Sequence, residues 1–272
     1  MIAAASPAPA AAFGDHLRSW RRRRRLSQLD LALDAEISQK HLSFCESGRA
    51  RPSRDMVVRL AERLEIPLRE RNALLLAAGY APLYPERPLD APELAAAREA
   101  VALVLEGHEP YPALAVDRHW SILATNAAVA PLLDGIAERA LLAPPANALR
   151  LSLHPGGLAP MIVNLGEWRA HLLERLARQV AASADEALER LLEELRAYPA
   201  PPHPRSDGAE RSAIAVPLRL RSPAGELAFI STVTVFGTPT DITLSEIAIE
   251  AFFPADEATK RALRVDRAAG AA

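Results

Sequence analysis

The feature of this 272-residue sequence that most constrains its fold is a series of short helical segments between residues 13 and 80. Apolar residues recur at helical spacing in each segment, and serines that can act as N-caps precede three of them, at Ser27, Ser38 and Ser53. Gly48 is placed where a left-handed residue ends a helix. Five short helices in about 70 residues predict a compact bundle.

A proline-rich stretch, APLYPERPLDAPE at residues 81 to 93, interrupts this pattern and predicts a domain boundary. Beyond it we expect helices at 92 to 106, near 126 to 133, at 165 to 182 and at 185 to 197. The residues YPALAVDRHWSILATN predict two short strands around a turn at Asp117 and Arg118, and the β-branched runs after Ala213 predict an antiparallel meander. Five strands with helices on one side predict an α+β domain.

The charges are distributed unevenly along the chain. Residues 1 to 80 contain 14 Lys and Arg against 9 Asp and Glu, and the remainder contains 18 against 25. A positive head on an acidic body indicates that the head binds a polyanion. Cys45 is the only cysteine, so an intramolecular disulfide is excluded, and no apolar run is long enough for a spanning helix. We therefore expect a cytoplasmic protein that does not bind membranes.

The stretch ISQKHLSFCESGRARPS, residues 37 to 53, places polar and apolar side chains on opposite sides of one predicted helix. Leu42 and Cys45 face the preceding helix. The residues that point outward are Gln39, Lys40, Ser43 and Phe44. Two helices joined by a short turn, the second exposing amide, ammonium and hydroxyl groups, have the dimensions needed to enter a DNA major groove.

The sequences LRSWR, LSQLDLALDAEIS, HLSFCESGRARPS and MVVRLAERL resemble, in order and spacing, the Xre/Cro-type helix-turn-helix family of bacterial and phage repressors. The resemblance covers residues 13 to about 64. It implies that Gln28 donates to a phosphate, that Gln39, Lys40 and Phe44 contact bases, and that arginines after the helix hold the DNA backbone. The DNA-binding residues expected in this way are Gln28, Ser38, Gln39, Lys40, Ser43, Phe44, Arg49, Arg51 and Arg54.

Several of these residues have a second interpretation. The run from Arg21 to Arg25 contacts phosphates or forms a solvated helix end, except that Arg21, by the family resemblance, pairs with Glu46 and is structural. Phe44 contacts a thymine methyl or is a shielded hydrophobic residue. Cys45 is expected to be a core residue rather than a redox switch. Glu36 departs from the family, which has Gly at this turn, and costs on the order of 1 kcal/mol if its φ is positive.

Catalytic and metal-binding signatures are incomplete in this sequence. The stretch HEPYP at residue 108 lacks the second histidine of a zinc-protease motif, the remaining histidines are scattered, and no P-loop or GxGxxG occurs. We therefore expect no enzyme activity, no metal and no cofactor other than a bound effector.

The C-terminal two thirds resembles the ligand-binding domain of MmyB-like transcription regulators, on segments that include EPYPALAVDRHWSILATNAA, LRLSLHPGGLAP, NLGEW and TVFGTPTDITLSEIAIEAFFPAD. The resemblance implies a PAS-like sheet around an apolar pocket for a fatty-acid-like or other small hydrophobic molecule. The candidate ligand-binding residues are Trp120, Asn126, Arg150, His154, Trp168, Phe229, Thr232 and Phe236. The aromatic residues are equally compatible with plain core packing, and Arg150 and His154 either meet a carboxylate or are simply exposed.

These patterns give a domain plan and two functional hypotheses. The plan is a disordered leader at 1–12, a helix-turn-helix domain at 13–80, a linker at 81–92, a ligand-binding and dimerisation domain at 93–260, and a tail at 261–272. The first hypothesis is a homodimeric repressor that binds a double-stranded DNA operator and responds to a small hydrophobic ligand. The alternative is a protein-interaction module, as in antitoxins, whose helical head binds a protein partner.

Overall fold

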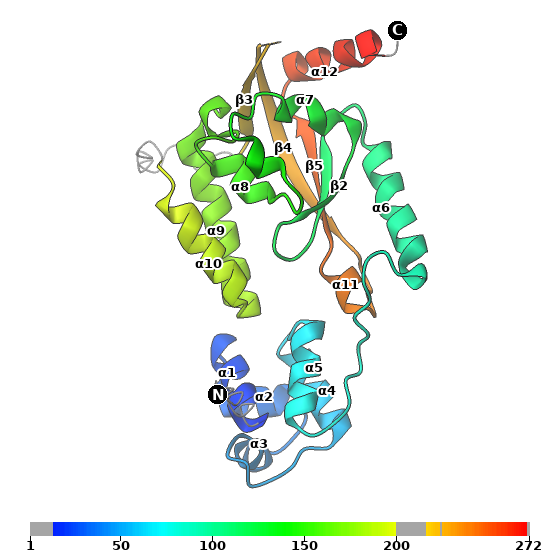
Figure 1. The fold of residues 1–272 in the computed structure, drawn as a ribbon. Helices are drawn as coiled ribbons and strands as arrows, with labels where there is room; N and C mark the ends of the chain where they lie inside the picture. Colours follow the sequence, from blue (N-terminus) through cyan, green and yellow to red (C-terminus); the bar gives the residue numbers. More distant parts are fainter. Residues whose placement is uncertain (1–12, 200–215, 224, 271–272) are drawn as a thin grey trace, which may run out of the picture. The chain divides into compact units, whose positions relative to one another are not determined.

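The computed structural model describes residues 13–199, 216–223 and 225–270, which form two compact units (Figure 1). The helical unit contains the described residues up to Glu86 together with Thr240–Ile242. The sheet unit contains the described residues of Arg87–Pro239 and of the segment from Thr243 onward. The chain therefore passes from one unit to the other three times.

The helical unit contains the five predicted helices. They are α1 (Phe13–Arg23), α2 (Gln28–Asp34), α3 (Gln39–Glu46), α4 (Arg54–Arg63) and α5 (Leu68–Ala77). The hydroxyls of Ser27, Ser38 and Ser53 each accept a hydrogen bond from the third backbone N–H of the following helix, as expected of N-caps. Local capping thus fixes where these helices begin.

The core of the helical unit is built from one apolar side of each helix. Cys45 is buried in this core, which confirms its predicted packing role. The largest fully buried side chains are Leu17, Leu31, Leu42, Leu60, Leu64, Ile66, Leu74 and Leu75. Burial of each contributes about 1.5–3 kcal/mol.

Three helices of this unit end in a non-glycine residue with positive φ. Glu36 has φ 54°, as predicted for the turn between α2 and α3, and Arg25 and Glu65 have φ 58° and 48° after α1 and α4. In each turn the next residue's N–H reaches back into the helix, for example from Ile37 to the Ala32 carbonyl at 2.9 Å. The turn at Glu36 therefore keeps its helix-turn-helix geometry.

The sheet unit combines a five-stranded sheet with helices. The strands are β1 (Ala113–Val116), β2 (Ile122–Thr125), β3 (Leu218–Ser222), β4 (Gly225–Val235) and β5 (Ala248–Pro254). The α-helices are α6 (Ala95–Gly107), α7 (Ala130–Leu133), α8 (Ala148–Leu153), α9 (Leu165–Ser183), α10 (Glu186–Ala197), α11 (Ile242–Ser245, which begins in the helical unit) and α12 (Glu257–Gly270). Short 3₁₀ helices are η1 (Pro92–Leu94), η2 (Ala127–Val129), η3 (Arg139–Leu142) and η4 (Ala159–Met161).

The sheet has the order β2-β1-β5-β4-β3, and all neighbouring strands are antiparallel. This arrangement confirms the predicted hairpin around Asp117 and Arg118, the meander of the last three strands and the α+β fold class. The connection from β1 and β2 to the rest of the sheet is non-local, because β1 pairs with β5.

Helices cover both faces of the sheet, whereas the sequence predicted helices on one side only. On one face, Val116, Leu220 and Phe229 pack with residues of α8, α9 and α10. On the other face, Ala113 and Ala115 pack against α6 (Figure 1). We call these the α9 face and the α6 face. The expectation was wrong because the apolar side of α6 matches the small side chains of β1, a pairing with no local sequence signal.

A loop contacts each of the two edge strands at one residue. The N–H of Val163 donates to the Arg219 carbonyl of β3 at 2.8 Å, and the N–H of Ile122 in β2 donates to the Ala146 carbonyl at 2.7 Å. In the described part of the chain, residues 230–235 of β4 pair with β5 alone, so this part of the sheet has no strand on its other side.

Candidate functional site

Helix α3 exposes the side that the sequence predicted to be outward. Gln39 and Lys40 are exposed in its first turn, whereas Leu42 and Cys45 are buried against the rest of the bundle. Ser43 is half-buried between these two sides. The helix therefore presents an amide and an ammonium group from a fixed backbone, and both can donate hydrogen bonds outward.

Phe44 lies between two cations at the edge of α3. The Lys40 Nζ is 5.7 Å from the centre of the Phe44 ring, and the Arg49 guanidinium carbon is 5.4 Å from it. Both distances are within the range of cation–π interactions. The half-buried Phe44 ring is therefore within cation–π range of both Lys40 and Arg49.

The buried carboxylate of Glu46 fixes α3 to the helices behind it. Arg21 donates to both of its oxygens, at 2.6 and 2.8 Å, and Gln28 Nε2 donates at 2.8 Å. Arg18 donates to the Glu46 carbonyl oxygen at 2.6 Å. This confirms the predicted pair of Arg21 and Glu46, and it joins α1, α2 and α3 at one point.

The electrostatics of this cluster favour the charged form of Glu46. Burial raises the pKa of Glu46, but the hydrogen bonds from Arg21 and Gln28 and the charges of Arg21 and Arg18 outweigh it, so the pKa is lowered overall. The hydrogen bond to Glu46 raises the pKa of Arg21. The pair is therefore ionised at neutral pH, behind the exposed side of α3.

The other candidate DNA-binding residues differ in what they contact. Gln28 is bonded to Glu46, and Arg51 donates to the carbonyl oxygens of Ala78 and Gly79 at 3.2 and 3.3 Å. The hydroxyl of Ser38 caps α3. Arg49 and Arg54 are exposed. Gln28, Ser38 and Arg51 thus already have partners within the unit.

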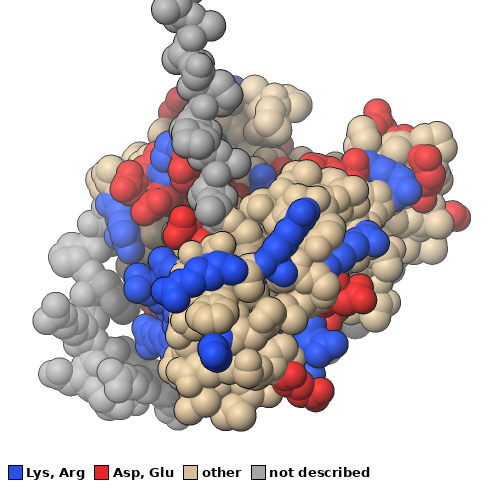
Figure 2. Space-filling model, turned by 90° about the horizontal axis from the view of Figure 1, so that it is seen from below, with Lys and Arg blue, Asp and Glu red and all other residues tan. Residues whose placement is uncertain are grey.

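The arginines at the end of α1 also differ in their contacts and exposure. Arg24 donates to the carbonyl oxygens of Leu64 and Glu65, both at 2.8 Å, and so closes the end of α4. Arg22, Arg23 and Arg25 are exposed. In Figure 2, which faces the helical unit, Lys and Arg side chains are spread over the surface, and the acidic side chains in view lie mostly toward its margins.

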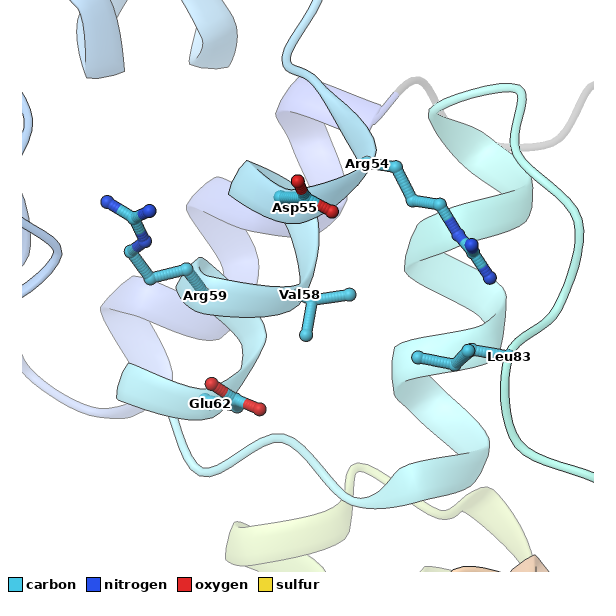
Figure 3. A pocket seen from close by; sticks show the side chains of 6 residues that line it. All are labelled: Arg54, Asp55, Val58, Arg59, Glu62 and Leu83. Atoms are coloured by element: carbon cyan, nitrogen blue, oxygen red, sulfur yellow. The ribbon is translucent and has the colours of Figure 1, made fainter.

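A separate hollow of about 320 Å³ lies on the outer side of α4 (Figure 3). Leu83 and Val58 face each other across it, and the other lining residues are Arg54, Asp55, Arg59 and Glu62. Its charges are of both signs. Such a surface suits a polar protein or peptide segment better than a phosphate backbone.

In the sheet unit, three candidate ligand residues belong to one buried cluster. Trp120, Trp168 and Phe229 pack together with residues of α8, α9 and α10. The indole N–H of Trp120 donates to Gln179 at 2.9 Å, and that of Trp168 donates to Ser152 at 3.0 Å. The cluster is therefore apolar, and the indole N–H groups of its two tryptophans are hydrogen-bonded to side chains beside it.

Asn126, Phe236 and Thr232 do not join that cluster. The amide of Asn126 bonds the backbone of Ala113, Leu105 and Tyr111. Phe236 packs against the α6 side of the sheet. Thr232 pairs with Ala251 on the α6 face, opposite to Phe229. These three residues therefore lie apart from the buried aromatic cluster and contact the strands and the backbone around them.

Arg150 and His154 lie together at the surface between α8 and α10. Arg150 donates to both oxygens of Glu194, at 2.8 and 2.7 Å, and Tyr198 donates to the same carboxylate. The His154 ring packs edge-on against Tyr198, with 5.0 Å between ring centres. The hydrogen bond from Arg150 lowers the pKa of Glu194, so Arg150 already has an ionised partner.

Comparison with protein families decides what these two units are. A family model described as the MmyB-like transcription regulator ligand binding domain matches residues 97–265. The chain belongs to the MmyB-like transcription regulator family. A helix-turn-helix domain model also matches residues 12–74. This MmyB-like protein is therefore a DNA-binding transcription regulator with a domain for a small-molecule effector.

Other comparisons add less. Among solved structures, the clp gene regulator ClgR from Corynebacterium glutamicum matches with 26% identity, over 39% of this chain and 99% of that chain. Its TM-score of 0.23 is too low for an argument about fold or function. No curated protein matched the MmyB-like chain. In the described part of the chain, no cluster of side chains suited to a metal ion and no helix long and apolar enough to cross a bilayer is found.

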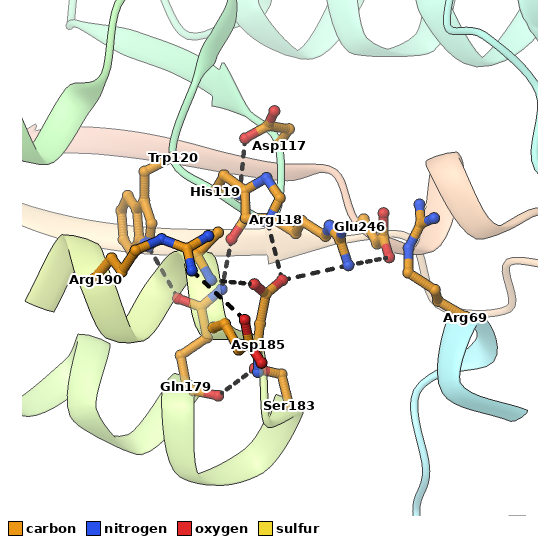
Figure 4. Close-up of polar contacts among 12 residues, drawn as sticks. Arg69, Asp117, Arg118, His119, Trp120, Gln179, Ser183, Asp185, Arg190 and Glu246 are labelled. Atoms are coloured by element: carbon orange, nitrogen blue, oxygen red, sulfur yellow. Dashed lines mark hydrogen bonds and ion pairs between the residues drawn. The ribbon is translucent and has the colours of Figure 1, made fainter. Parts of the chain in front are cut away.

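The sequence did not predict a polar network beside the buried aromatic cluster of the MmyB-like domain (Figure 4). His119 Nε2 lies 2.9 Å from Asp185, and Arg118 contacts Asp185 at 3.3 Å and Glu246 at 3.7 Å. Arg175 of α9 pairs with the buried Glu250 of β5 and lies 4.5 Å from the Trp120 ring centre. The only local signal was Asp185, which is the N-cap of α10.

This network holds an unusual turn. Trp120 has φ 68°, a left-handed conformation that is rare for a large side chain. Asp117 accepts the N–H groups of His119 and Ser121, both at 2.8 Å, and Gln179 donates to the Arg118 carbonyl at 2.9 Å. The turn between β1 and β2 is therefore tied to α9 at the same place where Trp120 enters the core.

Proposed function

We propose that this MmyB-like regulator is a cytoplasmic, homodimeric repressor that reads its operator with α3. The observation that carries the proposal is that Gln39 and Lys40 are exposed on a helix whose other side is locked by Glu46. Glutamine can bond adenine through two hydrogen bonds, and lysine can donate to guanine O6 and N7 in the major groove. A fixed backbone keeps these donors in one register.

Backbone contacts come from the exposed arginines. Arg49 and Arg54 flank α3 and the start of α4, and Arg22 and Arg25 are exposed at the end of α1. Each phosphate contact releases counterions and makes the affinity salt-dependent. One head has few such contacts, so we propose that two heads bind half-sites about 34–36 Å apart. Gln28 and Arg51 contribute indirectly, through their hydrogen bonds within the helical unit.

We propose that the effector is a small hydrophobic molecule, of a fatty-acid-like kind, held in a PAS-like domain near Trp120, Trp168 and Phe229. The strand order, with β1 beside β5, supports the PAS-like interpretation. The buried aromatic cluster supports an apolar ligand. We propose that Arg150 and His154, whose polar atoms bond Glu194 and Gly156 within the domain, lie at the margin of this ligand site.

The effector would act on DNA binding through the connection between β4 and β5. Within the helical unit, Ile242 N–H donates to the Pro85 carbonyl at 2.9 Å. Within the sheet unit, the hydroxyl of Thr243 donates to the Arg87 carbonyl at 2.6 Å. Two successive residues thus bond the linker on either side of its boundary. A ligand that shifts β4 or β5 moves this connection. Coupling requires that the effector bind with different affinities to the state that binds DNA and to the state that does not.

A mobility-shift titration with DNA from upstream of the coding sequence tests the base-reading role. Combined Gln39→Ala and Lys40→Ala substitution should weaken specific binding by about 30-fold or more, since each base contact is worth about 1–3 kcal/mol. Arg63→Ala is the matched control, because it removes one exposed cation from α4. Equal binding by all three proteins would refute the assignment.

A protein-interaction role, as in antitoxins, is the second candidate. Leu29 and Leu33, one helical turn apart on α2, are 50% and 67% exposed, which suits a protein partner. The slope of affinity against salt on duplex DNA separates the two functions. A DNA reader gives a steep slope, and a protein-binding head gives none.

A further inference from the structure

Helix α6 is apolar on two opposite sides. On one side, Val101 and Leu105 are buried against the sheet. On the side turned away, Ala96, Ala100 and Leu103 form a stripe at helical spacing, and Leu103 is 64% exposed. A helix with apolar residues on two opposite sides is typical of a helix packed between two surfaces. The outer side of α6 therefore calls for a covering surface.

The α6 face of the sheet has an open half. Ile230, Thr232 and Thr234 of β4 lie on this face and are exposed. Phe253 of β5 pairs with Ile230 in the register and extends the exposed area. Its ring contacts His108 edge-on, with 4.6 Å between ring centres. The α6 face thus consists of a protruding helix over β1 and β5 and a flat, partly apolar area over β4 and β3.

This shape is complementary to a second copy of itself. A two-fold axis parallel to the strands exchanges the two halves of the face, so that α6 of each copy lies over the open half of the other. An axis across the strands would instead place one protruding helix on the other. The first arrangement buries the outer stripe of α6 and the exposed residues of β4 together.

The charges at the margins match in the same arrangement. β3 presents exposed Arg219 and Arg221 on the α6 face, beyond β4. α6 presents exposed Glu99 and Glu106. The two-fold axis brings the acidic helix of one copy over the basic strand of the other. Arg219 also binds Glu226 of β4 at 2.6 Å within its own chain, so this margin carries two arginines against one glutamate. Opposite charges at a rim favour one register of association.

We propose that the open half of the α6 face is the homodimer interface of this regulator. The stripe of Ala96, Ala100 and Leu103 packs on Ile230 and Thr232 of the second chain. The inference rests on the proposed function, which requires two DNA-binding heads in one particle.

Sedimentation velocity of the full chain at micromolar concentration tests the interface. The parent protein should be a dimer, and Ile230→Asp should raise the dimer dissociation constant by about 30-fold or more. Val233→Asp is the matched control, because Val233 is 45% exposed against 39% for Ile230 and lies on the opposite face of the same strand. It should remain dimeric. Circular dichroism and thermal unfolding check that both variants are folded.

Cross-linking gives a second readout that tolerates a weakened fold. A Leu103→Cys chain mixed with a Thr232→Cys chain should form a disulfide-linked heterodimer under mild oxidation. Leu103→Cys mixed with Val233→Cys should not form it, because the two positions lie on different faces of the partner's sheet. The natural Cys45 is buried and adds little background.

The results separate this interface from the proposed function. A monomeric parent protein, or a dimer equally stable in Ile230→Asp and Val233→Asp, overturns the interface even if the protein binds its operator. A dimer lost in Ile230→Asp alone supports the interface, even in a protein that fails to bind DNA and so refutes the proposed function.

Discussion

The helical unit and the sheet unit place their buried polar groups differently. In the helical unit, Glu46 and Arg21 lie directly behind α3 and fix a surface that faces outward. In the sheet unit, the network of Asp185 and the pair of Arg175 and Glu250 lie beside the apolar core. A fixed outward surface suits recognition of a rigid partner. A network that borders the core can respond to what the core contains.

The largest expected effect is a loss of stability in the sheet unit alone. Phe229→Ala removes a fully buried ring from the aromatic cluster and should lower the free energy of unfolding of this unit by about 3–5 kcal/mol. Chemical denaturation followed by tryptophan fluorescence measures it, because Trp20 reports the helical unit and Trp120 and Trp168 report the sheet unit. Equal shifts of both transitions would show that the units unfold together.

A slightly smaller effect is expected in the helical unit. Glu46→Ala leaves the buried Arg21 without its carboxylate and should cost about 3 kcal/mol. Asp15→Ala breaks only the exposed pair with Arg18 and should cost about 0.5 kcal/mol or less. The Trp20 transition in urea measures both. A loss for Asp15→Ala as large as for Glu46→Ala would contradict the role given to the buried pair.

Acid should weaken the sheet unit at a higher pH than the helical unit. Burial, with the charges of Arg175 and Arg178, lowers the pKa of His171 below its ordinary 6.5, so the stability from its neutral form is complete above pH 6.5 and is lost as the pH falls. The lowered pKa of Glu46 contributes stability that is complete above its ordinary 4.5 and is lost only below it.

Thermal melts between pH 7 and pH 4 check this order. Trp120 and Trp168 should report a falling melting temperature first, and Trp20 should follow in more acidic buffer. His171→Gln should remove the earlier decline. An unchanged early decline in that variant would assign it to another group.

The smallest effect concerns the DNA surface. Arg54→Ala should reduce the slope of log affinity against log salt by about 1, as expected for one lost phosphate contact. Arg139→Ala removes an exposed arginine of the sheet unit and should leave the slope unchanged. Equal slopes for both variants would remove Arg54 from the proposed backbone contacts.

The sequence predicted the helical unit well because its signals are local. The caps at Ser27, Ser38 and Ser53 mark helix starts within a few residues. The positive φ of Glu36 was implied by the resemblance to the helix-turn-helix family. The bond between Gln28 and Glu46 was not predicted. Sequence spacing alone does not show that two polar side chains from different helices turn toward each other.

The sheet unit was harder to predict because its contacts are distant in sequence. The short α8 has too few turns for a clear periodic pattern, and residues 261–270, expected to be a tail, belong to α12. Arg118 and Asp185 meet only because the β1–β2 turn is held on α9. The sequence did indicate that Phe229 and Thr232 do not face the same site, because residues three apart in a strand lie on opposite faces of the sheet.

The assignment of Thr240–Ile242 to the helical unit has a consequence for biosynthesis. The helices up to Ala77 leave the ribosome early, whereas the segment that bonds Pro85 follows after roughly 150 more residues, or on the order of 10 s at ordinary translation rates. The helical unit of a nascent chain therefore has all five helices but still lacks the hydrogen bond from Ile242 to Pro85. Fragments cut after Glu86 reproduce that immature state rather than the finished one.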